Sequence, residues 1–151
     1  SSHARVPSLV EDAYDSGDHK MQISAIYAMG RTADSRWLPI ILDEMASSSH
    51  EMRVEAATAA GQIGHSEAVS ELAYLASDED LEVRLAAVTA LGQIGGSHAM
   101  RILEELDGDP DFGDVQFAID DAMEEAAGMI DIDLSRLDWD NDRDDDRFLA
   151  V

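Results

Sequence analysis

Apolar residues recur along most of the chain in two alternating kinds of segment. One kind is rich in alanine and ends with a glycine, as in MQISAIYAMG, MRVEAATAAG and VRLAAVTALG, which close at Gly30, Gly61 and Gly92. The other kind carries apolar residues three and four positions apart, as in the segment 69–75. Both patterns are typical of α-helices that bury one face. We therefore expect an all-α protein.

The chain repeats itself every 31 residues, which is the interval between successive members of the three glycines. Gln22, Arg53 and Arg84 fall in register, each eight residues before its glycine. Gln116 follows Arg84 by 32 residues, so a fourth copy begins after one inserted residue. A fixed period of this size is typical of solenoids, in which each unit buries its apolar face only against its neighbours.

Each copy is predicted to contain two helices joined by a turn. A first helix, such as 82–92, is followed by a GQIG-type turn in which glycine adopts the left-handed conformation that ends a helix. A second helix follows, and a loop rich in Asp and Ser leads to the next copy. We expect aspartates of these loops to cap the helix that follows them; the candidates are Asp78, Asp80, Asp109 and Asp111.

The register divides the chain into two parts. Residues 1–128 are predicted to form a right-handed α-solenoid with the second helix of a truncated repeat at 6–15, three full helix pairs, and a final first helix at 113–127. Residues 129–151 form an irregular acidic tail, which contains apolar residues such as Trp139 and is expected to cap the last repeat in part. Because the chain begins without methionine, we expect it to be a trimmed piece of a longer protein.

Two phrases carry a family resemblance, DEDLEVRLAAVTALGQIG and EMRVEAATAAGQIG. They resemble the HEAT-like repeats of the phycobilisome lyase type. The resemblance implies an α-solenoid with first helices on its convex side and second helices on its concave side. It also implies that Arg53 and Arg84 form rungs of an internal ladder with Asp78 or Asp80. Such repeats occur in lyases, hydroxylases and scaffolds alike, so the resemblance indicates the fold and not the activity.

The charge of the chain restricts its partners. Thirty-three acidic residues against ten basic ones give a formal net charge of −23, which repels phosphate backbones and argues against nucleic acid. The acidity indicates either a basic partner or general hydration in a salt-rich cytoplasm, and its even spread favours the second. No apolar run is long enough to span a membrane, so we expect a cytoplasmic protein without a membrane partner.

Candidate chemistry is sparse. His50 and Glu51 resemble the His-Glu pairs that hold iron in deoxyhypusine hydroxylase, but there is one such pair and the pattern places it in the loop before a helix. Most histidines are predicted to lie in loops or turns, there is no cysteine, and no G-x-S-x-G motif is present. We therefore expect no metal, no cofactor and no catalysis. The alternatives are an accessory part of a larger enzyme or lyase complex and, less favoured, a metal-dependent HEAT-like oxygenase.

The second helices offer the remaining candidate site. Asp12, Asp43, Tyr74 and Glu105 occupy equivalent positions, and a neighbouring row contains Leu9, Ile40, Glu71 and Ile102. If the apolar members are exposed, the rows form a groove edged by carboxylates that suits a basic amphipathic segment, with Tyr74 as an aromatic anchor. If they are buried, the rows are core residues beside solvated acids. We predict a scaffold that binds a protein or peptide through Asp12, Ile40, Asp43, Glu71, Tyr74, Ile102 and Glu105.

Overall fold

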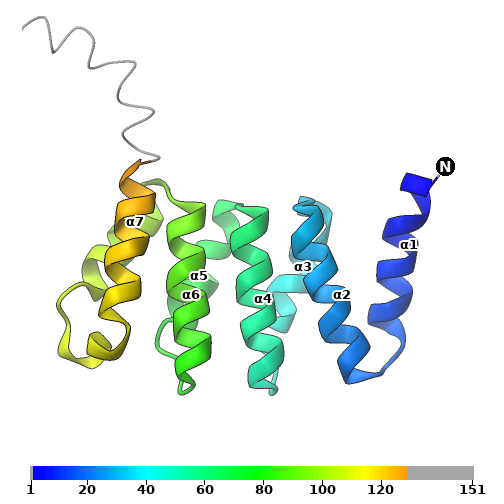
Figure 1. The fold of residues 1–151 in the computed structure, drawn as a ribbon, viewed down its shortest axis with the longest axis horizontal. Helices are drawn as coiled ribbons and strands as arrows, with labels where there is room; N and C mark the ends of the chain where they lie inside the picture. The colour runs from blue at the N-terminus through cyan, green and yellow to red at the C-terminus, as the bar shows by residue number, and fades with distance from the viewer. Residues whose placement is uncertain (1, 129–151) are drawn as a thin grey trace, which may run out of the picture.

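The computed structural model describes residues 2–128, with side chains from Val6 onward. Helices follow one another along a single array (Figure 1). They are α1 (Ser2–Asp15), α2 (His19–Thr32), α3 (Leu38–Glu44), α4 (His50–Ile63), α5 (Val69–Leu75), α6 (Leu81–Ile94), α7 (Gly96–Leu106) and a last helix over 116–128. Short 3₁₀ turns, Ser35–Trp37, Ser66–Ala68 and Pro110–Val115, lead into α3, α5 and the last helix.

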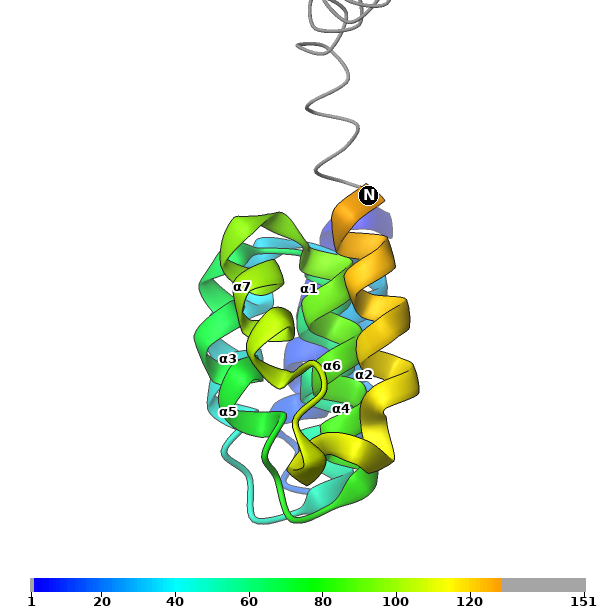
Figure 2. The same cartoon turned by 90° about the vertical axis from the view of Figure 1, so that its left-hand side faces the viewer.

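The helices are arranged in two layers, which are separated in the end-on view of Figure 2. Helices α2, α4, α6 and 116–128 form the first-helix layer, in which α4 packs against both α2 and α6. Helices α3, α5 and α7 form the second-helix layer and pack against α4 and α6. The predicted all-α solenoid is confirmed. Helix α1 packs on α2 at the N-terminal end, where the register placed a second helix without its partner.

The core lies between the two layers and is built from the apolar residues that define the repeat. Met52 and Leu72 are buried in the second full pair, and the equivalent Val83 and Leu103 are buried in the third. Alanines such as Ala59 and Ala90 are buried where neighbouring first helices meet. Their small side chains let the helix backbones approach closely, so the alanine-rich pattern reflects dense packing between copies.

The repeated glycines do not end the first helices, contrary to the sequence prediction. Helix α6 extends to Ile94, so Gly92 lies inside it, and Gly61 lies inside α4 in the same way. The second glycine of the GQIG segment ends α4, because Gly64 has φ +75° and closes the helix in the left-handed conformation. The predicted left-handed glycine of the GQIG segment is confirmed at Gly64, whereas the predicted helix end at 92 was two residues too early.

The repeated glycines instead allow the first helices to touch. A Cβ atom placed on Gly61 would lie 2.9 Å from both the Cα and the Cβ of Ala90. The same close approach occurs between Gly30 and Ala59 and between Gly92 and Ala122. The last pair lies one residue further apart in sequence than the others, which confirms the inserted residue in the fourth copy.

Two helix starts differ from the predicted ones. The last helix begins at 116 and not at 113, because Pro110–Val115 forms a 3₁₀ turn with Asp109 accepting a hydrogen bond from the backbone N–H of Asp111. Helix α4 begins at His50, because the Ser49 side chain accepts a hydrogen bond from the Met52 N–H. His50 therefore lies in the first turn of a helix, where the sequence pattern had placed a loop.

The two ends of the array differ in polarity. In the last helix, Asp120 and Glu124 are exposed at the positions that Val88 and Gly92 occupy, buried, in α6. This end therefore carries charge where a further first helix would pack. At the other end, Met21 is 46% exposed although its equivalents Met52, Val83 and Val115 are buried. The expected capping role of residues 129–151 concerns a segment outside the described residues.

Glu55 sits at a contact position on α4 that alanine occupies in later copies, as Ala86 and Ala118. Burial disfavours the carboxylate and raises the pKa of Glu55 above its ordinary value of 4.5. The folded state thus binds the proton of the Glu55 carboxyl more tightly than the unfolded state does. The stability that this protonation contributes is lost as pH rises through the pKa of the folded state.

Replacing Glu55 by glutamine is therefore expected to raise the free energy of unfolding at pH 7 by about 0.5–1 kcal/mol. The gain should disappear as pH falls below the ordinary pKa, where the native carboxyl is already neutral in both states. Urea unfolding at several pH values measures this. Glu51→Gln, an exposed change of the same charge on the same helix, controls for the general relief of acidic repulsion. Equal gains in the two variants would contradict the effect assigned to burial.

Candidate protein-interaction face

The row predicted from the period lies at the surface along one side of the array. Asp43, Tyr74 and Glu105 project from α3, α5 and α7, and Asp12 extends the row onto α1. All four are exposed, and Tyr74 is 80% exposed, a large fraction for an aromatic side chain. An exposed tyrosine among carboxylates combines an apolar ring with negative charge, which suits a cationic partner.

The neighbouring row divides between core and surface. Ile40 and Ile102 are half-buried and pack against the core, whereas Glu71 is exposed one turn before Tyr74. Leu9 on α1 is largely exposed. The isoleucines therefore contribute mainly to packing, and a continuous apolar groove along this row is not present among the described residues. The face is better described as an acidic surface with Tyr74 at its centre, which we call the second-helix face.

A polar hollow of about 330 Å³ adjoins Tyr74. It is lined by Tyr74 together with Arg53, Ser77, Asp78 and Glu79. Asp78 is engaged by Arg53, but Glu79 is exposed and has no side-chain ion pair among the described residues. A guanidinium entering the hollow could stack on the Tyr74 ring and pair with Glu79.

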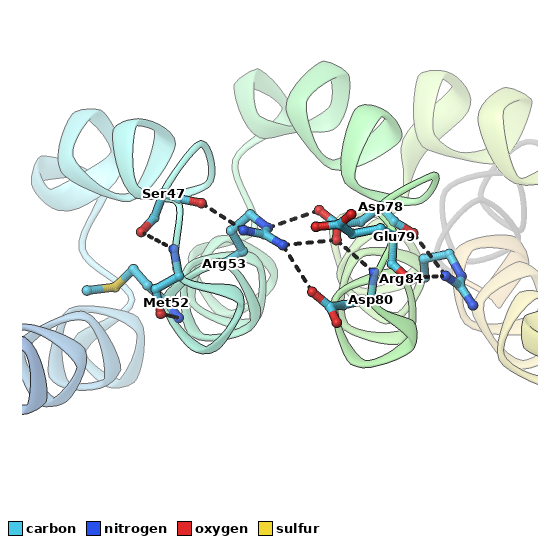
Figure 3. A network of polar contacts seen from close by, with 8 residues as sticks. Ser47, Met52, Arg53, Asp78, Glu79, Asp80 and Arg84 are labelled. Carbon is cyan, nitrogen blue, oxygen red and sulfur yellow. Dashed lines mark hydrogen bonds and ion pairs between the residues drawn. The ribbon is translucent and has the colours of Figure 1, made fainter.

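Arg53 joins consecutive copies and confirms the ladder that the resemblance implied (Figure 3). Its Nε and Nη2 atoms donate to the two Asp78 oxygens at 3.0 and 3.2 Å, and Nη2 also donates to Asp80 Oδ2 at 3.2 Å. Its Nη1 donates to the Ser47 carbonyl at 2.9 Å. The side chains of Arg53 and Asp78 are only 12% and 11% exposed. Arg53 is therefore committed to the structure and is not free to clamp a ligand.

Arg84 continues the ladder through the backbone of the same loop. Its Nη1 donates to the carbonyl oxygens of Asp78 and Glu79 at 2.9 and 3.2 Å, and its Nη2 pairs with Asp114 of the next copy. Asp80 stands at the start of α6 but makes no side-chain capping bond, and its carboxylate pairs with Arg53. The expectation that Asp78 and Asp80 cap α6 was therefore wrong. The Asp80 carboxylate forms an ion pair with Arg53, and the Asp78 carboxylate accepts a hydrogen bond from the Asp80 N–H.

A polar contact joins helix α1 to the second-helix layer. The Tyr14 hydroxyl donates to Glu44 Oε1 at 2.7 Å. Burial, followed by this bond and the nearby carboxylates, raises the pKa of Tyr14 to about 12. The phenol therefore stays protonated at physiological pH and keeps its donor role. This contact ties α1, and with it Asp12, to the end of α3.

Metal-ligating residues do not gather in the described part of the chain. No group of three or more His, Asp or Glu side chains within residues 2–128 is arranged to hold a metal ion. His50 and Glu51 are exposed in the first turn of α4. His19 Nε2 lies 3.1 Å from Ser49 Oγ, and His65 Nδ1 accepts from the Glu67 N–H, so both act in local contacts. Among these residues, no helix is both long and apolar enough to cross a membrane.

These features define an α-solenoid repeat protein with an acidic second-helix face. The family model described as HEAT repeats matches residues 38–124, which is more than half of the chain. The chain belongs to the HEAT-repeat family. The match does not distinguish the phycobilisome lyase type, which stays a prediction. A comparison with curated proteins finds no match.

Sequence reasoning missed a hollow on the other layer, between α6 and the last helix. Its lining includes Phe117, which is 63% exposed, and the acids Asp121 and Glu125. The sequence did contain a signal, because these residues differ from those of the two preceding copies, which carry aliphatic residues, threonine and glutamine at the equivalent positions.

Proposed function

We propose that this chain is a non-catalytic scaffold whose second-helix face binds a basic segment of a partner protein. The observation that carries the proposal is the exposed Tyr74 ring, set among acids and beside a hollow edged by Asp78 and Glu79. Protein binding is common among HEAT repeats, which supports the assignment. An accessory subunit of a larger enzyme would use the same face to hold its partner.

The mechanism is complementarity on a preformed surface. The ladder of Arg53 and Arg84 fixes the loop that lines the hollow, so little conformational freedom is lost when a partner docks. Carboxylates at equivalent positions in successive copies attract a basic segment and accelerate its encounter with the face. Tyr74 supplies buried area to the complex, since aromatic residues at the centre of an interface carry much of its energy.

The test uses a peptide of alternating arginine and alanine, followed by fluorescence anisotropy at low and physiological salt. Tyr74→Ala should weaken binding about tenfold, the effect of an interface anchor. Tyr27→Ala is the matched control, because Tyr27 is also exposed but lies on α2 in the first-helix layer. It should leave the affinity nearly unchanged.

The charge contribution is tested with two double variants that remove the same charge from different layers. Asp43→Asn with Glu105→Gln should weaken binding and flatten its salt dependence more than Glu51→Gln with Glu82→Gln. Equal losses in the two double variants, together with equal effects of the two tyrosine changes, would show that the peptide senses only the overall charge and that the face is wrongly assigned.

A further inference from the structure

A hollow of about 310 Å³ opens in the first-helix layer, between α6 and the last helix. Its apolar lining comes from Leu85, Phe117, Ala118 and Ala122, and its acidic lining from Asp121 and Glu125. Both acids belong to the last helix and lie four residues apart, hence one turn apart on the same side. The hollow is lined by none of the residues of the second-helix face.

Three residues of this hollow depart from the repeat, and they are neighbours in space. Phe117 stands where earlier copies have smaller aliphatic residues, and it is 63% exposed. Asp121 replaces the threonines of α4 and α6, and Glu125 replaces their glutamines, whereas α2 carries Tyr27 and Arg31 at these positions. The equivalent residues in α4 and α6 are Val54, Thr58, Gln62, Leu85, Thr89 and Gln93. These positions are therefore uncharged on α4 and α6. On the last helix, the same positions carry two acids and an exposed aromatic ring.

The combination favours one kind of occupant. Burial of an exposed Phe side chain removes apolar area from water, so Phe117 favours contact with an apolar group. Asp121 and Glu125 at the edge favour a cation next to that group and disfavour phosphate. Residues 129–151 suit the hollow poorly, because eight aspartates against three arginines would be brought near its acids.

We propose that this hollow is a second docking site, which binds a helical segment of a partner protein that carries an apolar anchor flanked by arginine or lysine. The anchor packs on Phe117 and Leu85, and the flanking cations pair with Asp121 and Glu125. Such a site lies on the opposite layer from the second-helix face, so one chain can hold two segments at once. The site does not depend on the function proposed for the other face.

The experiment uses the full chain and a defined peptide of roughly 15 residues, the length at which an isolated helix becomes stable in water. The peptide carries benzoylphenylalanine as its single apolar anchor, with arginines four residues to either side. Photolysis and mass spectrometry locate the attachment point, and anisotropy gives the affinity. The expected product joins the anchor to the lining of the hollow, at Leu85 or Phe117.

Two variants and their matched controls decide the outcome. Phe117→Ala should weaken binding about tenfold, and Asp121→Asn with Glu125→Gln about threefold to tenfold. The controls, Tyr27→Ala and Glu51→Gln with Glu82→Gln, should each change the affinity less than twofold. All the changed side chains are exposed, and circular dichroism verifies that the variants are folded. Attachment elsewhere, equal effects of variants and controls, or no binding because residues 129–151 occupy the hollow would each overturn the proposal.

Discussion

Replacing Arg53 by methionine is expected to lower the free energy of unfolding by about 3 kcal/mol. Methionine retains the unbranched shape of the side chain, so the loss reports the guanidinium and not a cavity. Without Arg53, the nearly buried Asp78 carboxylate keeps only the Asp80 N–H, and the Ser47 carbonyl loses its side-chain donor. A charge left without its partner in a partly dry site costs more than the original pair contributed.

Urea unfolding followed by circular dichroism measures this loss. Arg36→Met is the matched control, because Arg36 pairs with Asp34 at the surface and both side chains are about half exposed. The control should lose less than about 1 kcal/mol. The loss in the free energy of unfolding for Arg53→Gln should fall between these two. Gln22, which occupies the equivalent position, donates to a backbone carbonyl without forming an ion pair. Similar losses for Arg53→Met and Arg36→Met would show that the ladder does not hold the copies together.

Replacing Gly61 by alanine is expected to destabilise the protein by about 1–3 kcal/mol, although alanine is the better helix former. The added methyl would lie 2.9 Å from two carbon atoms of Ala90, and one of them belongs to the backbone of α6. Helices α4 and α6 must then move apart, which loosens contacts along their whole length. The intrinsic gain of about 1 kcal/mol from removing a helical glycine offsets only part of this cost.

Thermal and urea unfolding of Gly61→Ala should be compared with Gly113→Ala. A Cβ atom at Gly113 meets nothing within 4 Å, so this control should be neutral or slightly stabilising. Combining Gly61→Ala with Ala90→Gly should recover part of the lost stability, because the second change removes the Ala90 methyl that faces residue 61. A stabilised Gly61→Ala protein would mean that the added methyl is accommodated and that the approach of Ala90 does not restrict this position.

The order of helices was predictable because the repeat assigns each residue an equivalent position in other copies. The role of the repeated glycines was not. A glycine in sequence indicates conformational freedom, and only the neighbouring helix reveals that Gly61 is small because Ala90 approaches it. Helix starts were uncertain for a similar reason. Any serine of the segment 47–49 could have capped α4, and the choice of Ser49 makes His50 helical.

The candidate face was predicted in part. The period correctly aligned Asp43, Tyr74 and Glu105, but it could not tell that Ile40 and Ile102 turn toward the core, because half-buried positions carry the same residue types as exposed apolar ones. The hollow at Phe117 could have been found by asking where the last copy differs from the others. A position where one copy differs from the others indicates a function, because packing alone would keep the same residue type in every copy.

The unequal ends of the array bear on how separate molecules meet. A head-to-tail stack would bring Asp120 and Glu124 of one molecule against the N-terminal end of the next, where α1 and the exposed Met21 lie. Two carboxylates would then lose their water without gaining a partner, which costs several kcal/mol. Open-ended filaments arise when one surface fits a different surface of an identical copy. The charges on the last helix therefore disfavour end-to-end polymerisation of the described array.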